Sequence, residues 1–254
     1  MEVLHSKIVG EGTPLLILHG YFGMGDNWKS IANQLSSDFQ VHLIDQRNHG
    51  RSFHSEAFDY ELMAEDLKNY MDLHNLVSAH VLGHSMGGKT AMLFAVTYPE
   101  RVQRLLVADI APKAYKPHHE QVLAALNAVD FSVLQLRTEV DAILKNYLEE
   151  EGVRQFLLKN IYRKTKTELA FRFNLESLTD NNAEIGAPLP PFTEFEGPVL
   201  FLKGGNSPYI TADDTALIKA HFPNWQLLTI KNAGHWLHAE NPSDFLKEVQ
   251  KFLT

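Results

Sequence analysis

Short apolar runs alternate along this chain with longer stretches in which apolar residues recur every three or four positions. The second pattern places Trp28, Ile31, Ala32 and Leu35 on one face of a helix. Mostly apolar runs, typical of strands buried on both faces of a sheet, occur at 14–18, 41–44, 80–83, 105–108, 199–202 and 226–230. The alternation predicts an α/β fold with a mainly parallel sheet and helices on both of its faces.

Residues 112–192 interrupt this alternation. The segment opens after Ala111-Pro112 and closes at the turn-rich stretch 186–191, and its pattern favours helices near 121–129 and 139–148. It has no clear strand pattern, and His118-His119 reads as the solvated start of a helix. The sequence therefore predicts a core formed by residues 1–111 and 193–254, with residues 112–192 inserted between two strands as a helical cap.

Composition limits the classes of function. The chain has 254 residues and a net charge of −8, so a large single core is expected and a nucleic-acid partner is disfavoured. It has no cysteine, which excludes disulfides, a thiol nucleophile and thiolate metal sites. We see neither a secretion signal nor an apolar run long enough to span a bilayer, and we therefore expect a cytoplasmic protein without a membrane partner. Both a monomer and a dimer remain open.

The stretch Gly83-His84-Ser85-Met86-Gly87 matches the G-x-S-x-G pattern and lies between a predicted strand and a predicted helix. A sharp turn between a strand and a helix leaves little room for side chains two residues before and after the serine, and glycine fits there. The alternative is an ordinary turn with no catalytic role. The context favours Ser85 as a nucleophile raised above the edge of the sheet.

A serine hydroxyl needs an adjacent base to react at neutral pH. Of the 13 histidines, His235 follows the last predicted strand and precedes the last predicted helix. Loops at the carboxyl ends of parallel strands meet at one edge of the sheet, so we expect His235 beside Ser85. Two alternatives are a histidine that only packs and a metal pair formed with His238. No further metal ligands stand at a recognisable spacing, so we expect no metal and no other cofactor.

The imidazole also needs a carboxylate to orient it. The loop after the 199–202 strand contains no acid, whereas Asp109 ends the 105–108 strand. A charge at a buried strand end needs a partner, and His235 would provide one. We therefore expect Asp109 to be the acid, with Asn206 as a helper or a substitute. Asp45 also ends a strand, and we interpret it as structural.

An oxyanion hole needs two backbone donors. We expect Met86 to provide one N–H at the start of its helix and Tyr21, or else Phe22, to provide the other. Glycine at position 20 would let the backbone approach a ligand closely. Around these groups, the residues expected to contact the substrate are His19, Phe22, Asn206 and Trp236. The large apolar residues of the cap either line an acyl pocket or form the cap's own core: Phe131, Leu134, Phe156 and Tyr162.

Taken together, these motifs resemble the α/β-hydrolases over nearly the whole chain. The similar stretches are His19-Gly20, residues 45–52 (similar to D-x-R-G-x-G-x-S), residues 83–87 and Gly234-His235. A closer similarity, to the small bacterial esterases of the YbfF type, covers residues 83–89, 109–112 and 204–209. This resemblance implies that the acid follows the sixth strand of the family's sheet instead of the seventh, and Asp109 matches that position. It also implies that the substrates are carboxylic esters and acyl thioesters such as acyl-CoA.

The sequence thus predicts a serine hydrolase that forms an acyl-enzyme on Ser85. Hydrolysis of a carbon–carbon bond, or perhydrolysis without a cofactor, could use the same three side chains. A binding protein without catalysis on the same fold is the alternative from another class.

Overall fold

The computed structural model describes residues 2–117 and 119–254. Within them, seven strands form one sheet in the order β1-β3-β2-β4-β5-β8-β9, and β1 alone runs antiparallel to its neighbour. The bounds are β1 (Ser6–Val9), β2 (Thr13–Leu18), β3 (Phe39–Ile44), β4 (Ala79–His84), β5 (Val102–Ala108), β8 (Val199–Gly204) and β9 (Trp225–Ile230). The mainly parallel sheet confirms the expected fold class. β1 is a short edge strand with no buried residue, and it was not predicted from the sequence pattern.

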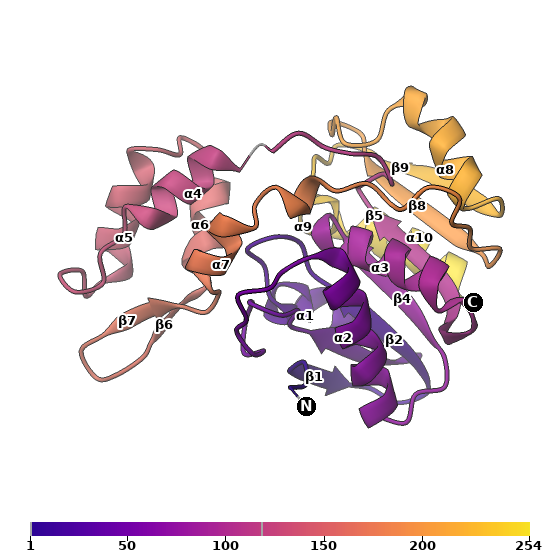
Figure 1. Ribbon diagram of the computed structural model, residues 1–254, viewed down its shortest axis with the longest axis horizontal. Coiled ribbons are helices and arrows are strands. Elements are labelled where there is room, and N and C mark those ends of the chain that lie inside the picture. Colours follow the sequence, from indigo (N-terminus) through magenta and orange to yellow (C-terminus); the bar gives the residue numbers. More distant parts are fainter. Residues whose placement is uncertain (1, 118) are drawn as a thin grey trace.

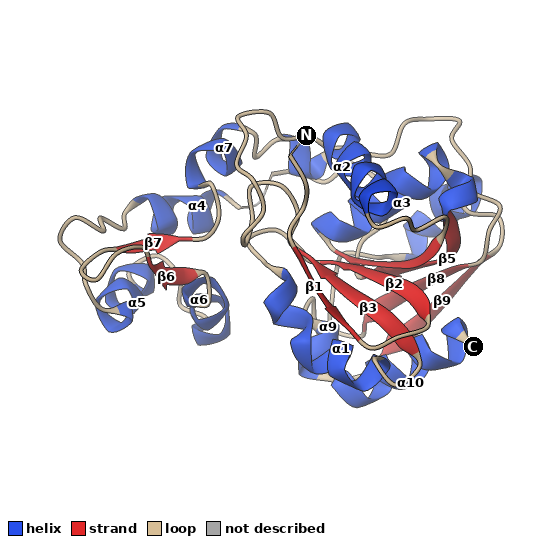
Figure 2. Cartoon of the chain, turned by 90° about the horizontal axis from the view of Figure 1, so that it is seen from below, coloured by secondary structure: helices blue, strands red, loops and turns tan. Residues whose placement is uncertain are grey.

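Helices cover both faces of the sheet (Figure 2). Along β2, Leu16 and Leu18 belong to the core beneath α2 and α3, whereas Leu15 and Ile17 belong to the core beneath α1 and α10. This split follows from the two-residue repeat of a strand. The helices of this part are α1 (Lys29–Leu35), α2 (Tyr60–Leu73), α3 (Met86–Thr97), α8 (Thr215–His221), α9 (Leu237–Glu240) and α10 (Pro242–Leu253). Short 3₁₀ helices lie at Gly25–Trp28, Pro99–Arg101 and Ala212–Asp214.

Residues 112–192, here called the inserted segment, lie to one side of the sheet (Figure 1). The elements are α4 (Glu120–Asn127), α5 (Arg137–Lys145), α6 (Glu151–Leu158), β6 (Ile161–Arg163), β7 (Leu169–Phe171), α7 (Leu175–Asp180) and a 3₁₀ turn at Glu184–Gly186. The expectation of no strand in this segment is wrong, because β6 and β7 pair as an antiparallel hairpin. Three-residue strands are too short to produce a recognisable alternation, so no local pattern predicts them.

Buried hydrogen bonds attach the inserted segment to the helices and loops above the sheet. The ammonium of Lys89 on α3 donates to the carbonyl oxygens of Lys113 and Ala187, near the two ends of the segment. The hydroxyl of Tyr21, in the loop after β2, donates to the carbonyl oxygen of Leu178 at 2.6 Å. The segment is therefore tied both to the helix that follows Ser85 and to the loop expected to hold an oxyanion.

Candidate active site

Ser85 occupies the sharp turn between β4 and α3. Its backbone has φ 53° and ψ −118°, a conformation that costs a residue with a side chain about 1–3 kcal/mol. The Ser85 amide donates to the carbonyl oxygen of Ala108 on β5 at 3.0 Å, which fixes the turn to the neighbouring strand. A side chain at Gly83 would overlap the carbonyl of Gly87, and one at Gly87 would overlap that of Leu18. The two glycines therefore permit the turn sterically, as the pattern predicted.

Asp109 directly follows β5 and is completely buried. Its backbone also has a positive φ of 54°, and its amide donates to the carbonyl oxygen of Leu202 at 2.8 Å. The carboxylate Oδ1 accepts a hydrogen bond from the Gly204 amide at 3.0 Å. The carboxylate Oδ2 accepts from the Ser207 hydroxyl and lies 2.8 Å from His235 Nδ1. The carboxylate at the end of β5 thus accepts hydrogen bonds from the last residue of β8 and from the loop that follows β8.

His235 lies in the loop after β9, where its imidazole stacks on the ring of Tyr209 with centroids 4.0 Å apart. Because Nδ1 faces the carboxylate of Asp109, the proton of the neutral ring belongs on Nδ1, and Nε2 is left as the basic nitrogen. His84 Nε2 donates to the His235 carbonyl at 2.8 Å and holds the loop from below. His235 and Ser85 line the same cavity. No hydrogen bond joins them within residues 2–117 and 119–254, and such bonds often form only with substrate.

The loop after β2 comes close to Ser85. A Cβ at Gly20 would lie 3.3 Å from Ser85 Cβ and 2.9 Å from a ring nitrogen of His84, so the backbone comes this close only with glycine. In the part of the chain that the structure describes, the amides of Tyr21 and Met86 have no acceptor. Met86 is the first residue of α3, where the helix dipole favours negative charge. Two backbone donors without an acceptor among the described residues thus belong to the cavities that Ser85 lines, Tyr21 to one and Met86 to the other.

The Phe22 amide, the alternative donor, is already occupied. It donates to His49 Nε2 at 3.3 Å, and His49 Nδ1 in turn binds the Arg47 carbonyl at 2.9 Å. Burial lowers the pKa of His49 to about 3, so the ring stays neutral and Nε2 remains an acceptor. Of the two candidates, Tyr21 is therefore the one with an available N–H, while the ring of Phe22 lines the cavity.

His19 holds the loop after β2 against the loop after β3. Its Nδ1 lies 2.8 Å from the Gly20 carbonyl, and its Nε2 accepts from the Gln46 amide at 3.0 Å. Burial lowers the pKa of His19 to about 4. Both ring nitrogens are used within the protein, which gives His19 a structural role. His19 also lines the cavity shared by Ser85 and His235, and its contact with substrate stays a prediction. Asp45 is structural as expected, since its carboxylate accepts from the amides of Gly25 and Arg51.

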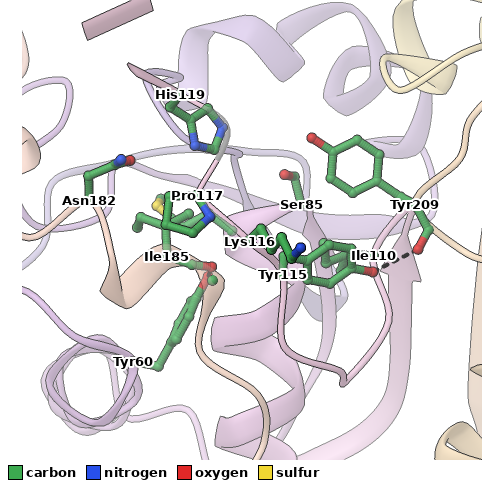
Figure 3. Close-up of a pocket in the computed structure, with 12 residues that line it drawn as sticks. Tyr60, Ser85, Ile110, Tyr115, Lys116, Pro117, His119, Asn182, Ile185 and Tyr209 are labelled. Atoms are coloured by element: carbon green, nitrogen blue, oxygen red, sulfur yellow. Dashed lines mark hydrogen bonds between the residues drawn. The ribbon is translucent and has the colours of Figure 1, made fainter. Parts of the chain in front are cut away.

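A cavity of about 680 Å³ lies between the edge of the sheet and the inserted segment. Trp236, expected to contact substrate, lines it next to Phe156 of α6. Phe131, one of the other cap residues considered, instead packs on Phe171 of β7 within the segment. A second cavity, of about 20 Å³, also reaches Ser85 (Figure 3). Ser85 thus lines two cavities of different size.

Asn206 does not take part in the site. Its side chain is exposed and lines neither cavity, and its amide donates to the Ala233 carbonyl at 2.9 Å. The expectation that it helps to orient His235 or contacts substrate is therefore wrong. The neighbouring Ser207 holds the Asp109 carboxylate instead. Ser207 was not among the predicted site residues, because its hydroxyl contacts a carboxylate that ends the neighbouring strand β5.

Among the described residues, the remaining histidines form no metal site. His238 is buried, and its ring stacks on Trp28 at 3.9 Å. Across the described ranges, no group of three or more histidine, cysteine or acidic side chains could hold a metal ion, and no helix could cross a membrane. His119 is half-buried and lines both cavities, so it is not the solvated residue that the sequence indicated. His118 lies outside the described residues.

The model of the alpha/beta hydrolase fold family matches residues 13–242. This chain belongs to the α/β-hydrolase fold family. That membership covers both the strands that carry Ser85 and Asp109 and the loop that carries His235.

Relatives within the family are named as enzymes that act on esters. The chain is 36% identical to esterase YbfF of Escherichia coli, over 95% of this chain and 93% of the relative. It is 38% identical to the sn-1-specific diacylglycerol lipase ABHD11 of Mus musculus, over 100% of this chain and 85% of the relative. Among solved structures, a marine microorganism esterase is 45% identical with a TM-score of 0.96, covering 99% of this chain and 100% of that one. The resemblance to YbfF-type esterases is confirmed.

Proposed function

We propose that this chain is a serine hydrolase that cleaves carboxylic esters or acyl thioesters, such as acyl-CoA, through an acyl-enzyme on Ser85. The observation that carries the proposal is the 2.8 Å contact between Asp109 Oδ2 and His235 Nδ1, with the imidazole and Ser85 on one cavity. Relatives named esterase and lipase support the same chemistry. The substrate is a small molecule, and the chain's own side chains suffice for the reaction.

In the first half of the reaction, Ser85 Oγ attacks the acyl carbonyl while His235 Nε2 accepts the hydroxyl proton. The carbonyl oxygen becomes an oxyanion that accepts hydrogen bonds from the amides of Tyr21 and Met86. The C–O or C–S bond then breaks, and the imidazolium gives its proton to the leaving alcohol or thiol. The product of this half is an ester of Ser85.

In the second half, water attacks the same carbonyl and His235 takes its proton. Collapse of the second oxyanion returns the proton to Ser85 and releases the carboxylic acid. Asp109 orients the imidazole and stabilises its positive charge in both halves. The Gly204 amide and the Ser207 hydroxyl hold the carboxylate in place and act through it, so both are positioning groups.

The test combines turnover with labelling of the nucleophile. We expect purified protein to hydrolyse p-nitrophenyl acetate and to react with a fluorophosphonate probe at Ser85, located by mass spectrometry of the modified peptide. Ser85→Ala should lose both the turnover and the adduct while keeping its circular dichroism spectrum. Parallel assays of a β-diketone and of peracid formation measure the other reactions open to the same three side chains. Absence of both ester turnover and a Ser85 adduct would overturn the proposal.

A further inference from the structure

Two cavities meet at Ser85, and they are built from different parts of the chain. The large cavity is lined by His235 and Trp236, whereas the small one is lined by neither. The small cavity instead lies beneath the two ends of the inserted segment (Figure 3). Its walls include Tyr60, Ile110, Tyr115 and Ile185. Ser85, Tyr209 and His119 line both cavities and so stand at the boundary between them.

We propose that the small cavity holds the acyl group and the large cavity holds the alcohol or thiol. The proposal rests on the function proposed above. The leaving group must receive its proton from His235, so it has to lie on the side where the imidazole is. The acyl group stays bonded to Ser85 and occupies the other side. The enzyme is therefore selective for esters that join a short acyl group to a large leaving group.

The volumes set the expected selectivity. A space of about 10–15 Å³ holds one water molecule, so a cavity of about 20 Å³ accommodates little more than the methyl group of an acetyl ester. The large cavity of about 680 Å³ falls within the range that holds a whole drug-sized ligand. A long acyl chain would have to displace the walls of the small cavity, whereas a bulky leaving group would not.

Hydrogen bonds hold the walls of the small cavity in place. The buried Tyr60 hydroxyl donates to the Ile185 carbonyl at 2.8 Å, which joins α2 to the end of the inserted segment. The Tyr115 hydroxyl donates to the Tyr209 carbonyl at 2.7 Å and accepts from the Ala111 amide at 2.9 Å. Opening this cavity would break these hydrogen bonds together. The walls of the small cavity are therefore rigid, and they limit the size of the acyl group.

Assays of two series of esters test the two cavities one at a time. With p-nitrophenol as the constant leaving group, we expect kcat/KM to fall at least tenfold from the acetate to the octanoate. With acetate as the constant acyl group, ethyl, benzyl and 1-naphthyl esters should show no such decline as the alcohol grows.

A matched pair of truncations tests the assignment of each wall. Ile185→Ala enlarges the small cavity and should raise the butyrate-to-acetate ratio of kcat/KM about tenfold. Val153→Ala removes the same kind of bulk from the wall of the large cavity and should leave that ratio unchanged. Ile185→Val, a milder change, should move the ratio in the same direction if the alanine variant folds poorly.

The outcomes distinguish this inference from the function on which it rests. An octanoate ester that is a better substrate than the acetate, or a ratio that responds to Val153 instead of Ile185, would overturn the acyl assignment while the serine hydrolase stands. A protein that turns over no ester in either series and forms no fluorophosphonate adduct would remove the proposed function itself. Steep loss along the acyl series with a flat alcohol series supports both.

Discussion

His235 Nδ1 lies 2.8 Å from Asp109 Oδ2, although the two residues are 126 positions apart in the chain. The contact joins the loop after β9 to the end of β5, with β8 between these strands in the sheet. The carboxylate is fully buried, whereas the imidazole side chain is 23% exposed, so the ring meets the cavity on one edge and the acid on the other. In this arrangement Nδ1 contacts the acid, and Nε2 is left to act as the proposed base.

Asp109→Asn should reduce kcat for p-nitrophenyl acetate by about 10³- to 10⁴-fold, because the amide can donate to Nδ1 and favour the wrong tautomer of His235. The shape of the side chain is kept, so the circular dichroism spectrum should not change. The measurement is kcat under saturating substrate. A value within tenfold of the unmodified protein would mean that another group orients the imidazole.

Ser207→Ala should lower kcat about 10- to 100-fold, less than the change at Asp109 itself. Its hydroxyl is one of two neutral donors to the carboxylate, and hydrogen bonds to charged groups contribute about 1.5–3 kcal/mol. KM should stay close to its original value, since Ser207 lines neither cavity. Asn206→Ala is the matched control, because Asn206 is adjacent but exposed. Equal kcat values for the two variants would show that the hydroxyl does not position the acid.

Gly87→Ala should destabilise the protein by about 1–3 kcal/mol or more and should also reduce turnover. The new Cβ would lie 2.6 Å from the His19 carbonyl oxygen, so the loop that carries the Tyr21 amide has to move. Gly152→Ala in α6 is the control, since a Cβ there meets nothing within 4 Å. That substitution should raise stability by about 0.5–1 kcal/mol. Urea denaturation of both variants checks the pair, and a Gly87 variant as stable as the control would contradict the close packing.

Acid should unfold this protein through its buried histidines. Burial lowers the pKa of His19 from 6.5 to about 4 and that of His49 from 6.5 to about 3. Between pH 6.5 and these values the unfolded chain binds more protons than the folded protein, so the free energy of unfolding falls as the pH falls. Each such histidine contributes a slope of about 1.4 kcal/mol per pH unit. Denaturant titrations from pH 7 to pH 4 measure the total slope.

His49→Gln should remove one such contribution, because a glutamine does not titrate there while its amide oxygen can still accept from the Phe22 amide. His54→Gln, at an exposed histidine, should leave the slope unchanged. If the two variants lose the same amount of slope, burial of His49 is not the source of the acid sensitivity.

Much of the fold was predictable because the parallel strands are buried on both faces and appear as nearly continuous apolar runs. Leu15 to Leu18 and Leu105 to Ala108 are examples in which every residue is buried. The edge strand β1 and the hairpin of β6 and β7 gave no such signal. They have few residues and are partly exposed, so neither continuity nor alternation distinguishes them. The boundaries of the inserted segment and a cytoplasmic location stay predictions.

The residues of the candidate site were likewise predictable only in part. Ser85, Asp109 and His235 were predicted from where they stand relative to strands, and each lies at a strand end or in the loop that follows it. Ser207 was missed because its role depends on a contact with a residue from another strand, which no local pattern encodes. The hydrogen bond from the Gln46 amide to His19 was missed for the same reason, and the contact of His19 with substrate stays a prediction.

The placement of the acid on β5 also matters for the order in which the enzyme is assembled. In the proposed roles, the nucleophile, the acid and both oxyanion donors precede residue 112, and the base alone follows the inserted segment, after β9. A chain that ends before residue 235 lacks the imidazole proposed to take the proton of Ser85. We therefore expect esterase activity to arise only after the part of the chain that follows the inserted segment has been made.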